Sequence, residues 1–346
     1  MTLPDTMQGL VCREDGYSGR SEGPTIENLA DWVSLESLPV PQPSGRQVLV
    51  KVGLANINPS DLHYIKGEYG QPRRKGVPAG FEAMGTVVAA GNDPAAQRLM
   101  NHRVAISVVK SGSGAWATYA LTDASTCVPL HPGLRDEDAA ALIVNPLTAF
   151  AMVRLAKEAG AKSFVMTAGA SQLCRLMASF GRDEGLTPVA VVRREEHRSL
   201  MEGLGAFVLN SARDDFPAML KQMIGECDPR ILLDAVGDEV SAAIFGSMGR
   251  KSRWIVYGKL SPTSPPLPSL GQLVFSGKRI EGFWLTEWLG AASPDQRREA
   301  FETVQARFVS GAWKTDVSEV MPLSEAPDRL AAALKGMNRG KVLLRP

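Results

Sequence analysis

The stretch SFVMTAGASQLCRLMASFGRDEGLTPVAVVRR, residues 163–194, decides the fold. It predicts a buried strand, a turn of small residues, a helix, and a second strand that ends in two arginines. Small side chains in the turn let a ligand approach the backbone closely, and the N-terminal amides of the following helix favour a pyrophosphate. The stretch therefore predicts a dinucleotide site in a doubly wound, parallel α/β sheet.

Two arginines, Arg193 and Arg194, stand where the second strand ends, and the first of them lies 24 residues beyond Gly169. An NAD site usually has an acidic residue here for the ribose 2′-hydroxyl, whereas two guanidiniums can grip a 2′-phosphate. The pair therefore favours NADPH. Cys174 takes the last glycine position of a full G-x-G-x-x-G motif, so the turn alone leaves a purely structural unit open.

Length, charge and cysteine content are typical of an enzyme of two domains. The chain has 346 residues, with 38 basic against 37 acidic side chains, and this balance favours neither nucleic acid nor an anionic membrane as a partner. It shows neither an apolar run of membrane-spanning length nor a signal-peptide core. The cysteines are too widely spaced for a disulfide framework or a zinc ribbon. We therefore expect a cytoplasmic protein that acts on a small molecule.

Two kinds of pattern divide the chain. From about residue 45 to 130, short alternating strands separated by glycine and proline predict a compact β domain. From about 145 to 285, helical patterns alternate with apolar strands, as in a parallel sheet covered on both faces. The strands expected in this second region are 164–166, 189–192, 207–209, 231–234, 254–257 and 280–283.

Short motifs follow one another in a specific order. They are INPSD at 57–61, GEY at 67–69, AGFEAMGTV at 79–87, NPLTA at 145–149, LLDAVG at 232–237 and GFWLTEW at 282–288. Together they resemble the medium-chain dehydrogenase/reductase superfamily, in the zinc-independent branch that contains quinone oxidoreductases and mitochondrial-type 2-enoyl thioester reductases. The resemblance covers nearly the whole chain.

The resemblance implies a domain division and an assembly. A GroES-like, β-rich catalytic domain is expected from residues 1–143 and 290–346, with a Rossmann NADP-binding domain inserted at 144–289. The sixth strand of the inserted domain, near 280–283, should form an open sheet edge. Relatives pair that edge across a two-fold axis, so we expect a homodimer.

No metal is expected. Where zinc alcohol dehydrogenases carry Gly-His-Glu, this chain has Gly80-Phe81-Glu82, so the imidazole is missing. The histidines are scattered and lack cysteine partners at the spacing of a zinc site. Alcohol oxidation, which needs a metal to polarise the carbonyl, is poorly supported.

Reduction of an activated C=C bond by NADPH does not need a metal to polarise a carbonyl, and we favour this reaction. The substrate would be a 2-enoyl thioester or an enone. The resemblance implies Tyr69 as the proton donor or substrate-orienting group, and Trp284 as a residue that shapes the acyl pocket. An ordinary packing role stays open for both. Two other functions also stay open: an NADPH:quinone oxidoreductase, and a non-catalytic, crystallin-like NADPH-binding protein.

The resemblance also implies the contacts of the cofactor. Residues at the start of the Rossmann domain should lie near the nicotinamide, the small-residue turn at the pyrophosphate, and the ends of the fifth and sixth strands beside the cofactor. A lysine of the final strand is expected at a phosphate. The expected cofactor-binding residues are Asn58, Asn145, Thr148, Gly169, Ala170, Ser171, Gln172, Leu173, Arg193, Arg194, Tyr257, Gly258, Leu260, Phe283, Leu285 and Lys341.

Overall fold

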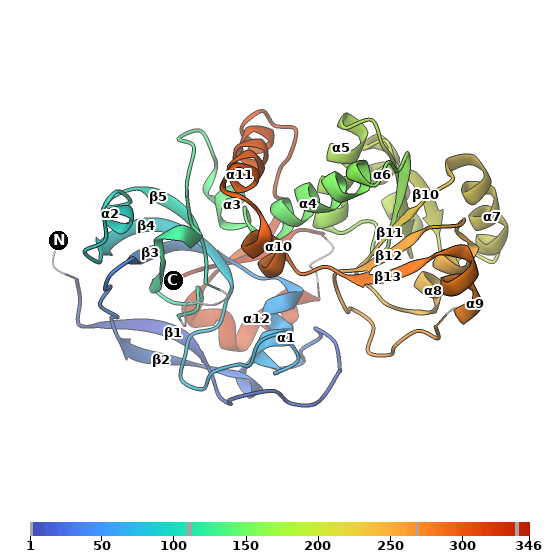
Figure 1. Ribbon diagram of the computed structural model, residues 1–346. Coiled ribbons are helices and arrows are strands. Elements are labelled where there is room, and N and C mark those ends of the chain that lie inside the picture. Colours follow the sequence, from blue (N-terminus) through green and yellow to red (C-terminus); the bar gives the residue numbers. More distant parts are fainter. Residues whose placement is uncertain (1–2, 109–112, 268, 336–338) are drawn as a thin grey trace. The chain divides into compact units, whose positions relative to one another are not determined.

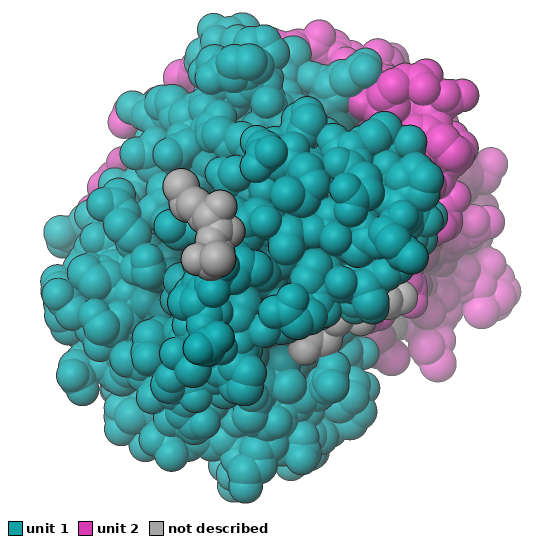
Figure 2. All heavy atoms as spheres, turned by 90° about the vertical axis from the view of Figure 1, so that its left-hand side faces the viewer, with its two compact units in different colours: residues 1–144, 301–346 teal, residues 145–300 magenta. Residues whose placement is uncertain are grey.

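The chain divides into two compact units in the computed structural model, which describes residues 3–108, 113–267, 269–335 and 339–346 (Figure 1). Unit 1 comprises residues 1–144 and 301–346, and unit 2 comprises residues 145–300 (Figure 2). The sequence analysis set the second junction at 289/290. It falls instead within helix α11 (Pro294–Val309), which is continuous across residue 300.

A six-stranded parallel sheet forms the centre of unit 2, in the order β10-β9-β8-β11-β12-β13. The order reverses beside β8, the first of these strands in the sequence. In open α/β sheets such a switch point, at the carboxyl ends of the strands, is where ligands bind. The strands are β8 Ser163–Met166, β9 Thr187–Val192, β10 Phe207–Asn210, β11 Ile231–Asp234, β12 Arg253–Val256 and β13 Arg279–Gly282.

Helices lie on both sides of this sheet (Figure 1). Because both faces are covered, β8 and β11 are buried along their whole length. The outer strand β13 is more exposed, with Ile280 at 37%. The helices are α4 Val144–Glu158, α5 Gln172–Asp183, η3 Glu195–His197, α6 Arg198–Gly203, α7 Phe216–Cys227, α8 Glu239–Ser247, α9 Leu270–Ser276 and α10 Leu285–Ala291.

Unit 1 is built on a seven-stranded sheet, in the order β14-β15-β3-β4-β5-β7 with β6 also pairing with β3. The final strand β15 is parallel to β14 and antiparallel to β3, so the C-terminal part of the chain completes a sheet that the N-terminal part begins. β1 and β2 form a separate antiparallel pair. The strands are β1 Thr6–Cys12, β2 Val33–Pro39, β3 Gln47–Asn56, β4 Glu82–Ala90, β5 Arg103–Ser107, β6 Tyr119–Asp123, β7 Cys127–Pro129, β14 Val317–Pro322 and β15 Lys341–Arg345.

Local sequence signals explain where the helices of unit 1 begin. α1 (Pro59–Ile65) starts with proline after an Asn58 N-cap, and the Asp61 side chain accepts the Asn58 N–H at 2.7 Å, as in a capping box. The other helices are η1 Leu29–Asp31, α2 Pro94–Gln97, η2 Ala124–Thr126, α3 Asp136–Ala140, η4 Leu323–Glu325 and α12 Ala326–Leu334. Within the described ranges, none of the helices has the length and apolar character that a membrane crossing requires.

Candidate functional site

The turn between β8 and α5 holds its backbone against the neighbouring strand. Gly169 donates its N–H to the carbonyl of Val191 on β9 at 2.8 Å. A Cβ atom at this position would lie only 2.7 Å from the backbone N of Val191, so a side chain does not fit unless the turn moves. Ala168 has a φ of +49°, in the left-handed region that non-glycine residues rarely adopt. Strain of this kind is typical of ligand-binding turns.

The N-terminus of α5 opens toward this turn. Ser171 caps the helix, and its hydroxyl accepts the N–H of Cys174 at 3.3 Å. Gln172 and Leu173 follow as half-buried residues of the first helical turn. The amides of that first turn lack partners within the helix itself and present positive partial charge to the turn. The arrangement suits a pyrophosphate.

Cys174 occupies the position of the last glycine in a G-x-G-x-x-G motif. Its Sγ lies 3.3 Å from the carbonyl of Thr167 and 3.8 Å from the hydroxyl of Tyr257. The side chain is fully buried, and burial raises the pKa of the thiol to about 11. Cys174 is therefore a neutral packing residue under the turn, and not a nucleophile.

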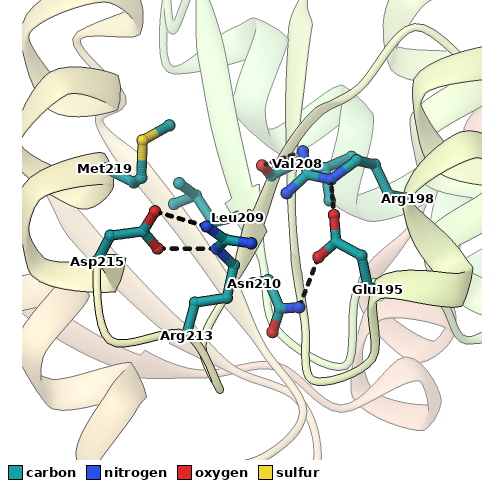
Figure 3. A pocket seen from close by; sticks show the side chains of 8 residues that line it. All are labelled: Glu195, Arg198, Val208, Leu209, Asn210, Arg213, Asp215 and Met219. Atoms are coloured by element: carbon teal, nitrogen blue, oxygen red, sulfur yellow. Dashed lines mark hydrogen bonds and ion pairs between the residues drawn. The ribbon is translucent and has the colours of Figure 1, made fainter.

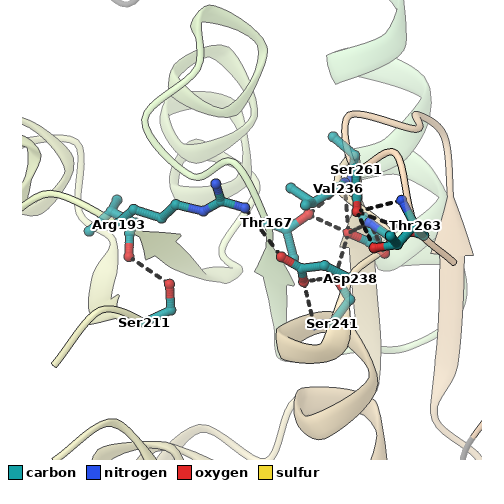
Figure 4. A network of polar contacts seen from close by, with 12 residues as sticks. Thr167, Arg193, Ser211, Val236, Asp238, Ser241, Ser261 and Thr263 are labelled. Carbon is teal, nitrogen blue, oxygen red and sulfur yellow. Dashed lines mark hydrogen bonds and ion pairs between the residues drawn. The ribbon is translucent and has the colours of Figure 1, made fainter. Parts of the chain in front are cut away.

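Asp234, at the end of β11, ties the adjacent loop to this turn. Its buried carboxylate accepts hydrogen bonds from the Thr167 hydroxyl, from Ser241 Oγ at 2.9 Å and from Trp254 Nε1 at 2.8 Å. It also accepts the backbone N–H groups of residues 236 and 237. Several partners appear in Figure 4. The sequence analysis missed this role, although an acidic residue that ends an apolar strand in LLDAVG is a signal for it.

The residues after β12 pair with the loop after β11. Tyr257 and Leu260 donate their N–H groups to the carbonyls of Asp234 and Ala235, at 2.9 and 3.0 Å. A Cβ at Gly258 would lie 3.0 Å from the Ala235 carbonyl oxygen, so this glycine permits the close approach. These residues therefore lie at the carboxyl edge of the sheet, the edge that also carries the small-residue turn.

The residues after β13 reach the same edge. Phe283 donates its N–H to the carbonyl of Val256 at 2.9 Å. The half-buried Trp284 is the N-cap residue of α10, and Leu285 begins that helix.

On α4, Asn145 and Thr148 lie one turn apart on one face. Asn145 is half-buried, and Thr148 is 7% exposed.

Arg193 and Arg194 follow β9 and are exposed. Their side chains are 72% and 57% accessible to solvent. Arg193 Nη2 lies 3.3 Å from Asp238 Oδ2, and Arg194 Nη1 lies 3.2 Å from Glu196 Oε1. Each guanidinium therefore stands at the edge of the sheet with an acidic neighbour.

Tyr69 lies in unit 1, in the segment after α1. Its half-buried ring packs against Phe81 with a centroid distance of 4.9 Å and an interplanar angle of 37°. The buried Phe81 donates its backbone N–H to Asp61 Oδ1 at 2.7 Å. Phe81 of the Gly-Phe-Glu segment thus forms an aromatic pair with Tyr69. In the part of the chain that the structure describes, no cluster of three or more His, Cys, Asp or Glu residues is placed to hold a metal ion.

A buried polar cluster, composed of Asn56, Asn58, Asp61, Glu82 and Lys341, lies beside this pair. Lys341 Nζ donates to Asn58 Oδ1 at 2.5 Å and to the Ile57 carbonyl at 3.3 Å. The side-chain amides of Asn56 and Asn58 donate to Glu82 Oε1 at 2.6 and 2.7 Å. All five residues are at most 4% exposed.

This cluster contains two residues that the sequence analysis expected at the cofactor. Lys341 was expected at a cofactor phosphate and Asn58 at the cofactor. In the structure their side chains are buried and bonded to each other, because a desolvated ammonium needs oxygen acceptors in the interior.

Burial also shifts the pKa values of two residues of this cluster toward neutral pH. Desolvation, with a smaller contribution from Glu82, raises the pKa of Asp61 to about 7. Desolvation lowers the pKa of Lys341 to about 8, although the charges of Glu82 and Asp61 oppose this shift. Both groups therefore titrate within about one unit of neutrality.

A cavity of about 310 Å³ lies beside β10 (Figure 3). Arg198 pairs with Glu195 there, and Arg213 forms two bonds of 2.9 Å with Asp215. Both arginines that line this cavity are therefore paired with carboxylates. The lining residues are Glu195, Arg198, Val208, Leu209, Asn210, Arg213, Asp215 and Met219.

Comparison with known proteins agrees with this architecture. Residues 44–132 match the alcohol dehydrogenase GroES-like domain family. The human mitochondrial enoyl-[acyl-carrier-protein] reductase is 27% identical over 321 residues, which cover 91% of this chain and 85% of that protein.

Solved structures extend the match to the whole chain. A candidate NADPH:quinone reductase of Mesorhizobium loti is 46% identical, with a TM-score of 0.96 and full coverage of both chains. Etr1p, solved with NADP and crotonyl-CoA, shares the fold at 20% identity, with a TM-score of 0.79 and coverage of 99% of this chain and 100% of its own. The predicted fold class, a GroES-like domain with a Rossmann domain, is confirmed.

Proposed function

Because the chain belongs to the zinc-independent branch of the medium-chain dehydrogenase/reductase superfamily, we propose that it is an NADPH-dependent reductase of activated C=C bonds. The substrate would be a 2-enoyl thioester or an enone, reduced without a metal. One observation carries the proposal: the tight turn at Gly169 leads into the N-terminus of α5, and two arginines end the adjacent strand. The relatives named as enoyl reductases support the thioester as substrate.

The residues at the carboxyl edge of unit 2 fit NADPH in charge and in shape. The amides of α5 complement the pyrophosphate, and the guanidiniums complement the 2′-phosphate. Gly169 keeps the turn free of a side chain where the backbone must approach closely. The residues proposed to hold the cofactor are Asn145, Thr148, Gly169, Ala170, Ser171, Gln172, Leu173, Arg193, Arg194, Tyr257, Gly258, Leu260, Phe283 and Leu285.

Bound NADPH supplies the hydride for the β-carbon of the substrate. The chain then has to deliver a proton to the α-carbon or orient the carbonyl that takes up charge, and we assign this role to the Tyr69 hydroxyl. The buried ring of Phe81, 4.9 Å away, limits the positions of the Tyr69 ring. Trp284, held at the start of α10, is proposed to shape the acyl pocket.

The test is a panel of 2-enoyl thioesters, enones and quinones, with NADPH oxidation followed at about 340 nm, the band of the reduced nicotinamide. Tyr69→Phe keeps the ring and removes the hydroxyl, so kcat on an enoyl substrate should fall by about 10²–10⁴-fold while NADPH binding is retained. Tyr64→Phe is the matched control, since Tyr64 packs on the same Phe81 ring at 5.2 Å. An unchanged enoyl rate in Tyr69→Phe would remove Tyr69 from the mechanism.

A second candidate function is reduction of a quinone by NADPH. The relative from Mesorhizobium loti, 46% identical, supports it. A quinone accepts hydride with little need for a proton donor, so its rate should depend far less on Tyr69. The same panel therefore separates the two functions. Tight NADPH binding with no turnover of any substrate would instead favour a crystallin-like role.

We propose a homodimer that forms through β13. This strand ends the described sheet, and exposed apolar side chains of the preceding helix α9, Val274 at 71% and Phe275 at 76%, lie close to it in the sequence. Open edges favour pairing between copies. Etr1p and Etr2p of Candida tropicalis form a heterodimer, which supports assembly in pairs. Light scattering should give twice the mass of one chain, and a monomer at high concentration would refute the proposal.

We propose the cytoplasm as the compartment. All four cysteines are free thiols, as in reducing surroundings. Some relatives are named as mitochondrial proteins. Fractionation of the native cells distinguishes the two locations.

A further inference from the structure

An ion pair spans the carboxyl edge of the sheet in unit 2. Arg193 follows β9 and Asp238 follows β11, and β8 lies between these two strands. The Arg193 side chain extends toward Asp238 at the start of α8, and Nη2 and Oδ2 are 3.3 Å apart (Figure 4). The pair therefore crosses the end of β8, which leads into the Gly169 turn.

The two side chains of this ion pair differ in how freely they can move. Asp238 is the N-cap residue of α8, and its Oδ1 accepts the N–H of Ser241 at 3.1 Å. Its side chain is only 23% exposed, whereas that of Arg193 is 72% exposed. The carboxylate is thus fixed by the helix, and the guanidinium is the partner that can move.

On the basis of the proposed NADPH site, we propose that Asp238 competes with the 2′-phosphate of the cofactor for Arg193. The carboxylate and the phosphate are both anions that accept the same guanidinium hydrogen bonds. Binding of the phosphate to Arg193 must separate the guanidinium from Asp238. This separation costs free energy, so Asp238 lowers the affinity for NADPH and moderates the preference for the 2′-phosphate.

Asp238→Asn tests the effect of the negative charge alone. Asparagine is as good an N-cap as aspartate, so α8 keeps its capping residue while the negative charge is lost. Removal of one surface charge beside a phosphate should tighten the Kd for NADPH about three- to tenfold. The gain should shrink as ionic strength rises, because exposed charges are screened.

The experiment is titration calorimetry of the full chain with NADPH, NADH, 2′,5′-ADP and 5′-AMP. NADPH and 2′,5′-ADP, which carry the 2′-phosphate, should bind Asp238→Asn about three- to tenfold more tightly than the native protein, and the other two ligands should change less than about twofold. Asp123→Asn in unit 1 is the matched control. Asp123 also caps a helical turn and pairs with an arginine, at 3.7 Å. It should leave all four affinities unchanged.

A double-mutant cycle with Arg193→Ala tests whether Asp238 acts through Arg193. The gain from Asp238→Asn should fall below about twofold in that background. A gain of equal size there, an unchanged Kd for NADPH in Asp238→Asn, or equal gains for NADH and NADPH would each overturn the inference and leave the proposed function standing. Native protein that binds no NADPH would overturn both.

Discussion

Gly169→Ala tests the geometry of the small-residue turn. The added Cβ would lie 2.7 Å from the N and 2.8 Å from the O of Val191, at least 0.6 Å inside ordinary contact. Both neighbours are backbone atoms of β9 and cannot rotate away as a side chain would. The turn must therefore move, and the 2.8 Å hydrogen bond from Gly169 N to Val191 O must lengthen or break.

The expected cost follows from these contacts. Overpacking against backbone costs about 1–3 kcal/mol, and a lost hydrogen bond about 0.5–1.5 kcal/mol. We therefore expect unit 2 to unfold at lower urea concentration, with a destabilisation of about 2–4 kcal/mol when these terms are taken together. NADPH should also bind more weakly, because the displaced turn carries the amides that face the pyrophosphate. Tryptophan fluorescence during urea unfolding, together with NADPH titration, measures both effects.

Gly225→Ala is the matched control. Gly225 is an exposed residue of α7, and a Cβ there meets nothing within 4 Å. Alanine should stabilise that helix by about 0.5–1 kcal/mol, so the same chemical change should have opposite signs at the two positions. A Gly169→Ala protein with native stability and native NADPH affinity would refute the account of the turn.

Three further predictions concern single features. Trp254→Phe removes one donor to the buried Asp234 carboxylate and should lower the unfolding free energy by about 1–3 kcal/mol, as measured by urea unfolding; an unchanged midpoint would contradict it. Burial raises the pKa of Asp61 to about 7 in the folded protein, so its contribution to stability is fully present below about pH 4 and is lost as pH rises through 7, with a slope of at most about 1.4 kcal/mol per pH unit. Unfolding at pH 5.5–8 should show this decline, and Asp61→Asn should flatten it, whereas native stability that rises over this range would refute it. NADPH-dependent turnover should survive chelators, since Phe81 replaces the histidine of zinc enzymes; stoichiometric zinc that is lost together with activity would show the opposite.

Local patterns were enough to predict the core of unit 2. The apolar runs around 164–166, 189–192 and 231–234 become β8, β9 and β11 with ends that differ by no more than two residues. Such runs are informative because a parallel sheet covered on both faces demands continuous apolar sequence. The turn at Gly169 was equally visible, since its small residues are consecutive.

The polar contacts were not visible, because their partners are far apart in the sequence. Lys341 bonds to Asn58 across 283 positions, and Asp234 bonds to Thr167 across 67. Periodicity reports only on which face of an element a residue lies, and it says nothing about which distant group will satisfy a buried charge. The internal acceptors of Lys341, the Ile57 carbonyl and Asn58 Oδ1, could therefore not be predicted from the final strand alone.

Glu82 shows how hydrogen bonds hold a buried carboxylate in unit 1. Its Oε1 accepts the two amides of Asn56 and Asn58, and its Oε2 accepts the backbone N–H groups of residues 143 and 144, at 3.1 and 2.8 Å. The second pair fixes the residues with which α4 begins, and α4 carries Asn145 and Thr148. A carboxylate with four donors needs no metal to neutralise it, because charge-assisted hydrogen bonds stabilise it in the interior. Glu82→Gln replaces one acceptor oxygen with a donor that faces those N–H groups or amides, so it should disturb the start of α4 as well as the buried polar cluster.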